Sequence, residues 1–358
     1  MSSEVPCMVM RGGSSKGAYF LESDLPADEA ERDDLLLRIL GSPDARQIDG
    51  IGGAHPLTSK VAIVRPASDD DTDVEYLFLQ VGVDTDVVAD RQNCGNLLAG
   101  VGPFAIERGL FEVEADSTDA TVRILMRNTN TMATARFAIA EGVPQYESSR
   151  TTDVGISGVP GTASPIHLEF DDLGGGSCGS MQPTGNAVDV IDGVECTLVD
   201  NGMPVVVVRA TDLGIAGDES CTELEANETL RAKLEAIRLQ AGLLMNLGDV
   251  SETTVPKMTM VSAPKSDGHL MTRTFIPHRC HDAIGVLGAV SVATVALLPG
   301  STAAGVVVEP GGDTVRLEHP TGFFDAVLEM NGTEVERAGI IRTARKLMDG
   351  AVFPRRDR

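Results

Sequence analysis

Two segments of this chain have the length of helices and are apolar on nearly every side. They are rich in Gly and Ala and cover Asn96–Glu107 and Ala283–Leu298. A helix without a polar face must be enclosed by other elements. Both segments are shorter than the roughly 20 residues of a membrane span. The sequence therefore predicts two core helices, one in each half of the chain.

Short β-branched runs bounded by Gly, Asp or Pro are typical of strands and occur throughout the chain. They are Val61–Val64, Tyr76–Val81, Ala120–Met126, Ile166–Phe170, Val205–Val208, Thr272–Ile276 and Val306–Val308. Helical spacing of apolar and charged residues predicts a surface helix at Thr222–Ala241, and we also expect a helix at Arg342–Asp349. One enclosed helix among many strands in each half predicts an α+β fold with two similar domains.

The Gly-rich stretch Gly174–Gly185 is the best candidate for a linker between these domains. We therefore expect an N-terminal domain over residues 1–183 and a C-terminal domain over 184–344. The path of residues 345–358 stays open, with a return to the first domain as one alternative.

Charge and composition exclude several kinds of partner. The chain has 53 Asp and Glu against 29 Lys and Arg, which gives a formal net charge of −24, and 42% of its residues are hydrophobic. Nucleic acid and anionic membranes are not expected partners, because binding phosphates needs a basic face. An anionic substrate needs a local positive pocket. Without a signal peptide or a membrane-length apolar run, we expect a cytoplasmic protein.

Cys94 stands directly before the first apolar segment. A thiol at a helix N-terminus gains thiolate character from the partial positive charge there, and the free N–H groups bind anions. We expect Asn93 to cap the helix and Cys94 to serve proton transfer beside a bound carboxylate. The alternative is a buried, inert cysteine, since cysteine is among the most buried residue types.

Lys60 enters an apolar strand directly after Ser59. Burial disfavours the charged form of an amine, so a lysine in such a place is suited to accept a proton. Most cations of this chain are Arg, which cannot act as a base. The alternative is a lysine at a strand end whose amine reaches solvent.

A Gly-rich turn with hydroxyls and cations follows the first strand, at Arg11–Gly17. It lacks the spacing of a Walker motif, but its backbone N–H groups suit carboxylate binding. An ordinary tight turn explains it equally well.

His278–Asp282 precedes the second apolar segment and contains His, Cys and His. Adjacent strand residues alternate between faces, so these side chains do not converge on one metal ion. We interpret Arg279 and His281 as anion contacts at the second helix, with a plain charged connection as the alternative. The six cysteines form no CxxC pair, and the chain contains no GxGxxG, GxSxG or HExxH motif. We expect no metal and no organic cofactor.

Several long motifs, taken in order, resemble those of the PrpF family. They are Arg11–Gly17, Gln47–Val64, Asn93–Glu107, Asp200–Val206, Met245–Val250, Pro277–Gly300 and Arg342–Asp349. The first reads RGGSSKG where the family usually has RGGTSKG. Within the family, the runs SPDARQIDGIGG, FIPHRCH and GVLGAVSVATVALLPG look most like those of 4-oxalomesaconate tautomerases.

The resemblance implies a diaminopimelate epimerase-like fold. In that fold two similar α+β domains each wrap a central helix, and the active site lies in the interdomain cleft. It also implies that Lys60 and Cys94, which match the family's functional positions, face the substrate. Epimerases of the wider superfamily have a cysteine at the start of both central helices, whereas here Asp282–Val286 has none. This favours a 1,3-proton shift over a two-thiol racemase mechanism.

The resemblance further implies a cofactor-independent isomerase that interconverts 4-oxalomesaconate and 4-carboxy-2-hydroxymuconate in gallate and protocatechuate catabolism. One alternative is a methylaconitate or related tricarboxylate isomerase, and another is a non-catalytic accessory protein of an aconitase-like enzyme. The oligomeric state stays open, with a homodimer as one option. The residues expected to bind the substrate are Arg11, Gly13, Ser14, Ser15, Ser59, Asn93, Gly95, Asn96, Arg279, His281 and Gly285.

Overall fold

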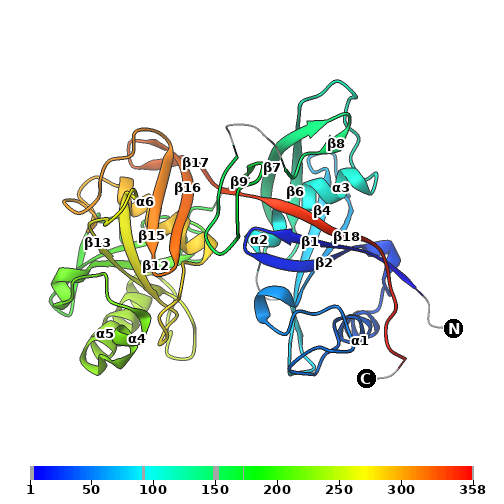
Figure 1. Ribbon diagram of the computed structural model, residues 1–358. Coiled ribbons are helices and arrows are strands. Elements are labelled where there is room, and N and C mark those ends of the chain that lie inside the picture. The colour runs from blue at the N-terminus through cyan, green and yellow to red at the C-terminus, as the bar shows by residue number, and fades with distance from the viewer. Residues whose placement is uncertain (1–3, 91–92, 148–152, 172, 357–358) are drawn as a thin grey trace. The chain divides into compact units, whose positions relative to one another are not determined.

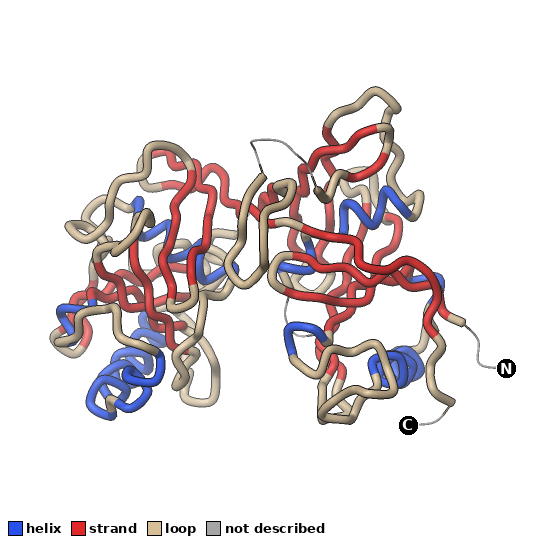
Figure 2. The backbone as a smooth tube through the Cα atoms, in the orientation of Figure 1, coloured by secondary structure: helices blue, strands red, loops and turns tan. Residues whose placement is uncertain are grey.

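Each half of the chain builds strands around one apolar helical segment, as Figures 1 and 2 show. The computed structural model describes residues 4–90, 93–147, 153–171 and 173–356. It divides into two units, Met1–Glu169 with Ile341–Arg358 and Phe170–Ile340. The α+β class expected from the sequence is confirmed in both units.

The first unit contains most of the early elements and the last strand. Its strands are β1 Val5–Gly12, β2 Ser15–Leu21, β3 Lys60–Pro66, β4 Val74–Val81, β5 Val88–Ala89, β6 Asp119–Met126, β7 Thr131–Ala140, β8 Val143–Pro144, β9 Ile166–Phe170 and β18 Ala344–Val352. Its helices are α1 Glu29–Leu40, α2 Gly95–Leu98 and α3 Val101–Glu107, with 3-10 turns η1 Glu22–Asp24 and η2 Pro56–Thr58.

The second unit has the same kinds of element. Its strands are β10 Asp189–Ile191, β11 Val194–Asp200, β12 Pro204–Arg209, β13 Lys257–Ser262, β14 Leu270–Phe275, β15 Thr314–His319, β16 Gly322–Asn331 and β17 Glu334–Arg342. Its helices are α4 Cys221–Ala226, α5 Glu228–Leu244 and α6 Val286–Leu297, with the 3-10 turn η3 Ala210–Leu213.

Strand pairing follows one pattern in both units. Along β1-β2-β3-β4-β6-β7 the pairs are antiparallel, parallel, antiparallel, parallel and antiparallel. The series β11-β12-β13-β14-β15-β16 repeats that sequence of pairings. Helices also fall at matching places, with α1 and α4–α5 before the third strand and α2–α3 and α6 before the fifth. The two units are therefore similar domains, although no repeat is visible in the sequence.

Burial on both faces explains why central strands are apolar without alternation. In β12, Val206 and Val208 pack against Leu234 and Ile237 of α5. The same strand contacts α6, whose residues from Gly288 to Ala296 are all buried. An outer helix and an enclosed helix thus cover the two faces of this sheet.

The first apolar segment forms two short helices rather than the single expected one. Ala99 and Gly100 separate α2 from α3 but keep right-handed backbone angles, so the path stays nearly helical. Gly100 lies against Tyr19, because a Cβ at this glycine would lie 2.5 Å from the Tyr19 hydroxyl. Close packing on β2 therefore accounts for the small residue at the break.

Two expected elements are wrong. Val306–Val308 is not a strand, because the amides of Val307 and Val308 donate to the carbonyls of Ala303 and His269 in an irregular segment. Arg342–Asp349 is not a helix. It contains the end of β17 and most of β18, which pairs antiparallel with β1.

The surface helix expected at Thr222–Ala241 is present as two helices, α4 and α5. The break lies at Asn227, whose side chain accepts a hydrogen bond from the Leu230 amide and so caps α5. Asn at a helix start satisfies an amide that has no partner within the helix, so the break has a local cause.

The chain first passes between the units at residues 169–170, before the boundary expected at 183. The Gly-rich stretch after it is held to β11 of the second unit. Gly174 pairs with Asn201, and the Asp200 carboxylate accepts hydrogen bonds from the Ser177 and Cys178 amides. These bonds explain why this stretch is part of a domain rather than a free linker.

Candidate active site

Lys60 is held between two strands at the start of β3. It pairs with Gly17 on β2 and with Gln80 on β4. Its side chain is buried, with the residue only 8% exposed, and its Nζ lies 3.6 Å from the Cys94 Sγ. This pair brings together the amine and the thiol that the sequence singled out, from positions 34 residues apart.

Cys94 occupies the N-cap position of α2, and its side chain makes no capping hydrogen bond. The expected cap, Asn93, is not at that position. The side-chain amide nitrogen of Asn93 donates to the Thr129 hydroxyl instead. The thiol therefore stands at the start of the α2–α3 path, where amides not paired within the helix favour negative charge.

The turn between β1 and β2 packs against the first turn of α2. Gly13 has φ +52°, and a Cβ there would lie 2.1 Å from the Asn96 Oδ1. The Asn96 side chain donates to the Ser14 hydroxyl at 3.4 Å, and the Ser15 hydroxyl is buried without a hydrogen-bond partner. An unpaired buried hydroxyl is uncommon in folded proteins.

Arg11 braces this turn. Its Nη1 donates to the Gly13 carbonyl at 2.8 Å and to the carbonyl and hydroxyl of Thr343. Burial and the nearby Arg345 lower the pKa of Arg11. Its hydrogen bonds account for a structural role, and no such bond links it to Lys60 or Cys94.

A pocket of about 330 Å³ lies beside this turn. Its lining includes the cations Arg11, Lys16 and Arg345 and the carboxylate Glu147. It is a local positive region in a strongly acidic chain. Neither Lys60 nor Cys94 lines it, so its charge does not by itself locate a substrate beside the thiol.

Ser59 is fully buried, and its hydroxyl is already used. Its single proton is shared between two acceptors, the Gln47 Oε1 at 2.7 Å and the His55 carbonyl at 3.0 Å. Gln47 also accepts from the Ala54 amide and donates to the Ser42 hydroxyl. Sequence reasoning from single motifs did not single out Gln47, which organises the loop that leads into Lys60.

The candidates in the second unit lie before α6. Gly285 is the N-cap of α6 and adds no side-chain bond to its first amides. The His281 Nδ1 accepts from the Ala283 amide, and burial lowers the pKa of His281. Arg279 is exposed and forms an ion pair with Glu225 at 2.8 Å. The Arg279 guanidinium, which the sequence suggested as an anion contact, is therefore already paired with a carboxylate of the protein.

Cys280 does not supply a second thiol at α6. It is buried, and burial together with the neighbouring Cys221 raises its pKa far above the usual range. A thiol in this environment stays protonated. That the reaction uses a thiol on one side alone stays a prediction.

Three aromatic residues missed by sequence reasoning surround the pair. The Tyr19 hydroxyl donates to the Leu97 carbonyl at 2.5 Å, and the Tyr76 hydroxyl donates to the Cys94 carbonyl at 3.5 Å. Burial raises the pKa of both phenols, which keeps them neutral donors. The Lys60 Nζ lies 4.9 Å from the centroid of the Phe78 ring. In the sequence these residues look like ordinary strand residues.

Within the described ranges, no group of three or more His, Cys, Asp or Glu side chains is arranged to hold a metal ion. Among the helices that the structure describes, none is long and apolar enough to cross a membrane.

The two domains and their enclosed helices define an α+β protein of the diaminopimelate epimerase-like fold. A solved hydroxyproline epimerase from Agrobacterium vitis is similar in fold, with a TM-score of 0.51 at 15% identity, covering 98% of this chain and 92% of that one. A solved methylitaconate-delta-isomerase is much more similar. Its TM-score is 0.89 at 35% identity, over 98% of this chain and 96% of that one.

The PrpF protein family model matches residues 2–355, so the chain belongs to the PrpF family. A (4E)-oxalomesaconate Delta-isomerase from Novosphingobium sp. is 57% identical over 97% of both chains. A 4-oxalomesaconate tautomerase from Pseudomonas putida is 54% identical, over 99% of this chain and 97% of the relative. The family resemblance seen in the sequence motifs is confirmed.

Proposed function

We propose that this chain is an isomerase that interconverts 4-oxalomesaconate and its enol form, 4-carboxy-2-hydroxymuconate. The observation that carries the proposal is the Lys60 Nζ to Cys94 Sγ contact of 3.6 Å at the start of α2. Its substrate assignment is supported by relatives of 54 and 57% identity that are named for oxalomesaconate.

The reaction needs only a proton to move. A C–H bond beside the carbonyl breaks and its proton goes to the Lys60 amine, while the electron pair spreads into the conjugated system and onto the carbonyl oxygen. Delivery of one proton to that oxygen gives the enol and completes the shift. Atoms and electrons balance without an oxidant, a reductant or a cofactor. Cys94 orients the dienolate or returns the proton.

Negative charge develops on the intermediate, and the first amides of α2 directly follow Cys94 in the chain. The amides of Gly95 and Asn96 begin α2, and the Ser15 hydroxyl is unpaired. Preorganised donors of this kind act on the transition state, and removing one typically costs on the order of 3 kcal/mol. We propose that these groups hold the substrate carboxylates and the oxyanion.

Purified protein alone, supplied with 4-oxalomesaconate, tests this function. We expect rapid change in the ultraviolet absorbance of the conjugated enol, and the rate should persist in EDTA. A non-catalytic accessory protein would give no rate above the uncatalysed reaction. Activity that disappears with EDTA and returns with a divalent ion would contradict the cofactor-independent mechanism.

A second candidate substrate is methylitaconate or a related acid. It is favoured by one observation, the TM-score of 0.89 to a solved methylitaconate-delta-isomerase. The same amine and thiol would serve its 1,3-proton shift. The ratio of kcat/KM values for the two acids decides between them, and we expect 4-oxalomesaconate to be the better substrate.

A further inference from the structure

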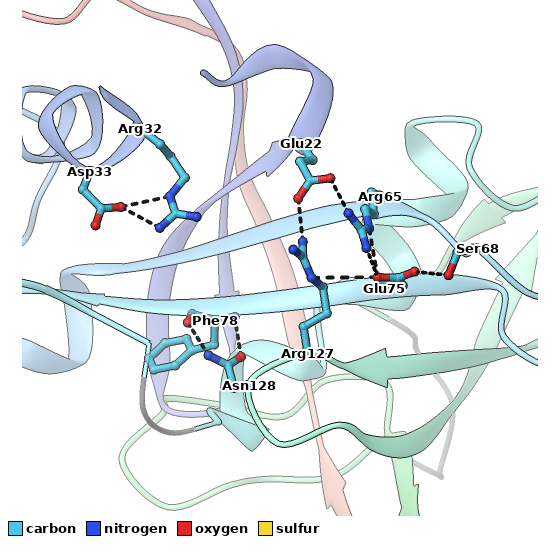
Figure 3. Close-up of polar contacts among 9 residues, drawn as sticks. All are labelled: Glu22, Arg32, Asp33, Arg65, Ser68, Glu75, Phe78, Arg127 and Asn128. Carbon is cyan, nitrogen blue, oxygen red and sulfur yellow. Dashed lines mark hydrogen bonds and ion pairs between the residues drawn. The ribbon is translucent and has the colours of Figure 1, made fainter. Parts of the chain in front are cut away.

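The turn between β6 and β7 supplies a side chain, that of Asn128, which forms hydrogen bonds with the backbone of β4. The Asn128 Oδ1 accepts from the Phe78 amide and its Nδ2 donates to the Phe78 carbonyl, both at 2.8 Å (Figure 3). The parallel pairing of β4 with β6 ends at Tyr76 and Met126. The Asn128 amide therefore takes the place of a strand residue opposite Phe78.

The same turn also binds Asp90 and Asn93, which precede the thiol in the chain. The Asn128 Nδ2 also donates to the Asp90 carbonyl at 2.6 Å. Next to it, the Thr129 hydroxyl accepts from Asn93, the residue before Cys94, at 2.5 Å. One short turn thus fixes β4 and the residues before α2 at the same time.

Phe78 and Lys60 are diagonal neighbours on β4 and β3, since Lys60 pairs with Gln80. Cross-strand neighbours at this offset lie within reach of aromatic and long side chains. The Lys60 Nζ lies over the face of this ring, 4.9 Å from its centroid, and 3.6 Å from the Cys94 Sγ. The position of Phe78 therefore decides where the Lys60 amine rests.

An ion-pair network anchors the turn at its first residue. Arg127 binds Glu22 at 2.5 Å and lies 3.8 Å from Glu75, and Arg65 binds both carboxylates (Figure 3). Glu75 is only 3% exposed, and partly buried pairs are screened less than surface ones. The turn is thus a fixed support for Asn128.

We propose that Asn128 is a positioning residue that holds the Phe78 ring and, through it, the Lys60 amine against the Cys94 thiol. This rests on the proposed role of Lys60 as the proton carrier. Asn128 makes its hydrogen bonds to the backbone of Phe78 and Asp90 rather than to the thiol or the amine, so it acts through Phe78. Its nearest partners belong to the protein backbone.

The first test needs no substrate. The rate of Cys94 alkylation by iodoacetamide is measured by peptide mass for wild type, Asn128→Ala, Lys60→Met and the double variant. We expect Asn128→Ala to slow alkylation at least threefold and to have no further effect when Lys60 is already Met. Such non-additivity identifies residues that act on each other.

Two variants guard against a folding artefact. Asn130→Gly changes the same turn at a residue with φ +54°, a backbone conformation that glycine tolerates, and should leave the alkylation rate unchanged. Phe78→Leu keeps an apolar strand residue but removes the ring, and it should reproduce the effect of Asn128→Ala. An equal effect of Asn128→Ala with and without Lys60 would overturn the proposal.

The second test uses 4-oxalomesaconate. Asn128→Ala should lower kcat by ten- to a hundredfold while KM changes less than threefold, because a misplaced catalytic group acts on the barrier. A change in KM alone would show that Asn128 supports substrate binding instead. If wild type does not turn over this acid, the proposed function fails, while the alkylation cycle still decides the role of Asn128.

Discussion

Cys94 and Cys280 are equally buried, at 8% exposed each, yet their surroundings differ. Cys94 has the Lys60 amine at 3.6 Å and lies at a helix start. Cys280 has Cys221 beside it and a strongly raised pKa. Exposure therefore does not distinguish the two thiols, whereas the neighbouring groups do.

We predict that a tricarboxylate analogue protects Cys94 from iodoacetamide. Bound carboxylates near the α2 amides would block the approach to the thiol. Peptide mass spectrometry at saturating analogue should show at least a tenfold slower reaction at Cys94. Cys280 serves as the internal control, since it should react slowly with or without analogue. Unchanged alkylation of Cys94 would leave only a structural role for this thiol.

At the scale of elements, the β1–β2 turn depends on a glycine. We predict that Gly13→Ala lowers the free energy of unfolding by more than the roughly 1–2 kcal/mol expected for a side chain in a left-handed conformation. The added Cβ would also meet Asn96 at 2.1 Å. Urea unfolding of wild type and Gly13→Ala measures this loss.

Gly109→Ala is the matched control, because Gly109 has φ +69° and open space around its Cβ position. It isolates the cost of the backbone conformation from that of the clash. Equal losses in the two variants would show that the contact with Asn96 carries no energy.

The C-terminal strand β18 is tied to α3 by Arg108, which binds both carboxylate oxygens of Asp349. Asp349→Asn should lower the free energy of unfolding at pH 7 by about 0.5–1 kcal/mol, since this pair is partly exposed and screened by solvent. Arg108 holds the pKa of Asp349 below 3.8.

A lowered folded-state pKa stabilises the protein above the unfolded value and stops doing so as pH falls through the folded one. The difference between wild type and Asp349→Asn should therefore be constant from pH 7 to 5 and shrink below about pH 4. Urea midpoints measured across this range check it. A difference that grows toward acid would contradict the assigned ion pair.

The sequence was sufficient to predict the enclosed helices and most strands, because each carries a local signal. It also singled out Lys60 and Cys94, which the structure brings together and whose catalytic roles stay a prediction. Burial of α6 follows from its composition, and Lys60 is conspicuous in an apolar run. The features that the sequence could not predict depend on contacts between residues far apart in the chain. Arg342–Asp349 is a strand only because β1 offers it a partner more than 300 residues away, and Asn128 acts on a strand 50 residues away.

At the scale of the whole molecule, the excess of 24 negative charges opposes compactness. We predict that NaCl raises the melting temperature up to about 1 M, where the Debye length falls to about 3 Å. Surface ion pairs weaken in salt too, but each contributes little. KCl at the same ionic strength should act alike. A melting temperature that falls steadily with salt would show that the ion pairs outweigh the repulsion.

Both units share one strand pattern, yet among the residues that the structure describes, an amine and a thiol are in contact at the enclosed helix of the first unit alone. The second begins α6 at Gly285 with no side-chain cap. We interpret this asymmetry as the difference between a one-sided proton shift and a two-thiol racemisation. The proposed reaction therefore depends on Lys60.

The turnover of 4-oxalomesaconate by Lys60→Met, compared with wild type at matched folding, tests this most directly. Met preserves the length and burial of the side chain and removes the proton carrier. We expect kcat to fall by about three orders of magnitude or more with little change in KM, since a general base acts on the barrier. Lys60→Arg should not restore activity, because Arg stays protonated. A Lys60→Met enzyme that keeps near wild-type kcat would remove Lys60 from the mechanism and leave Cys94 as the base.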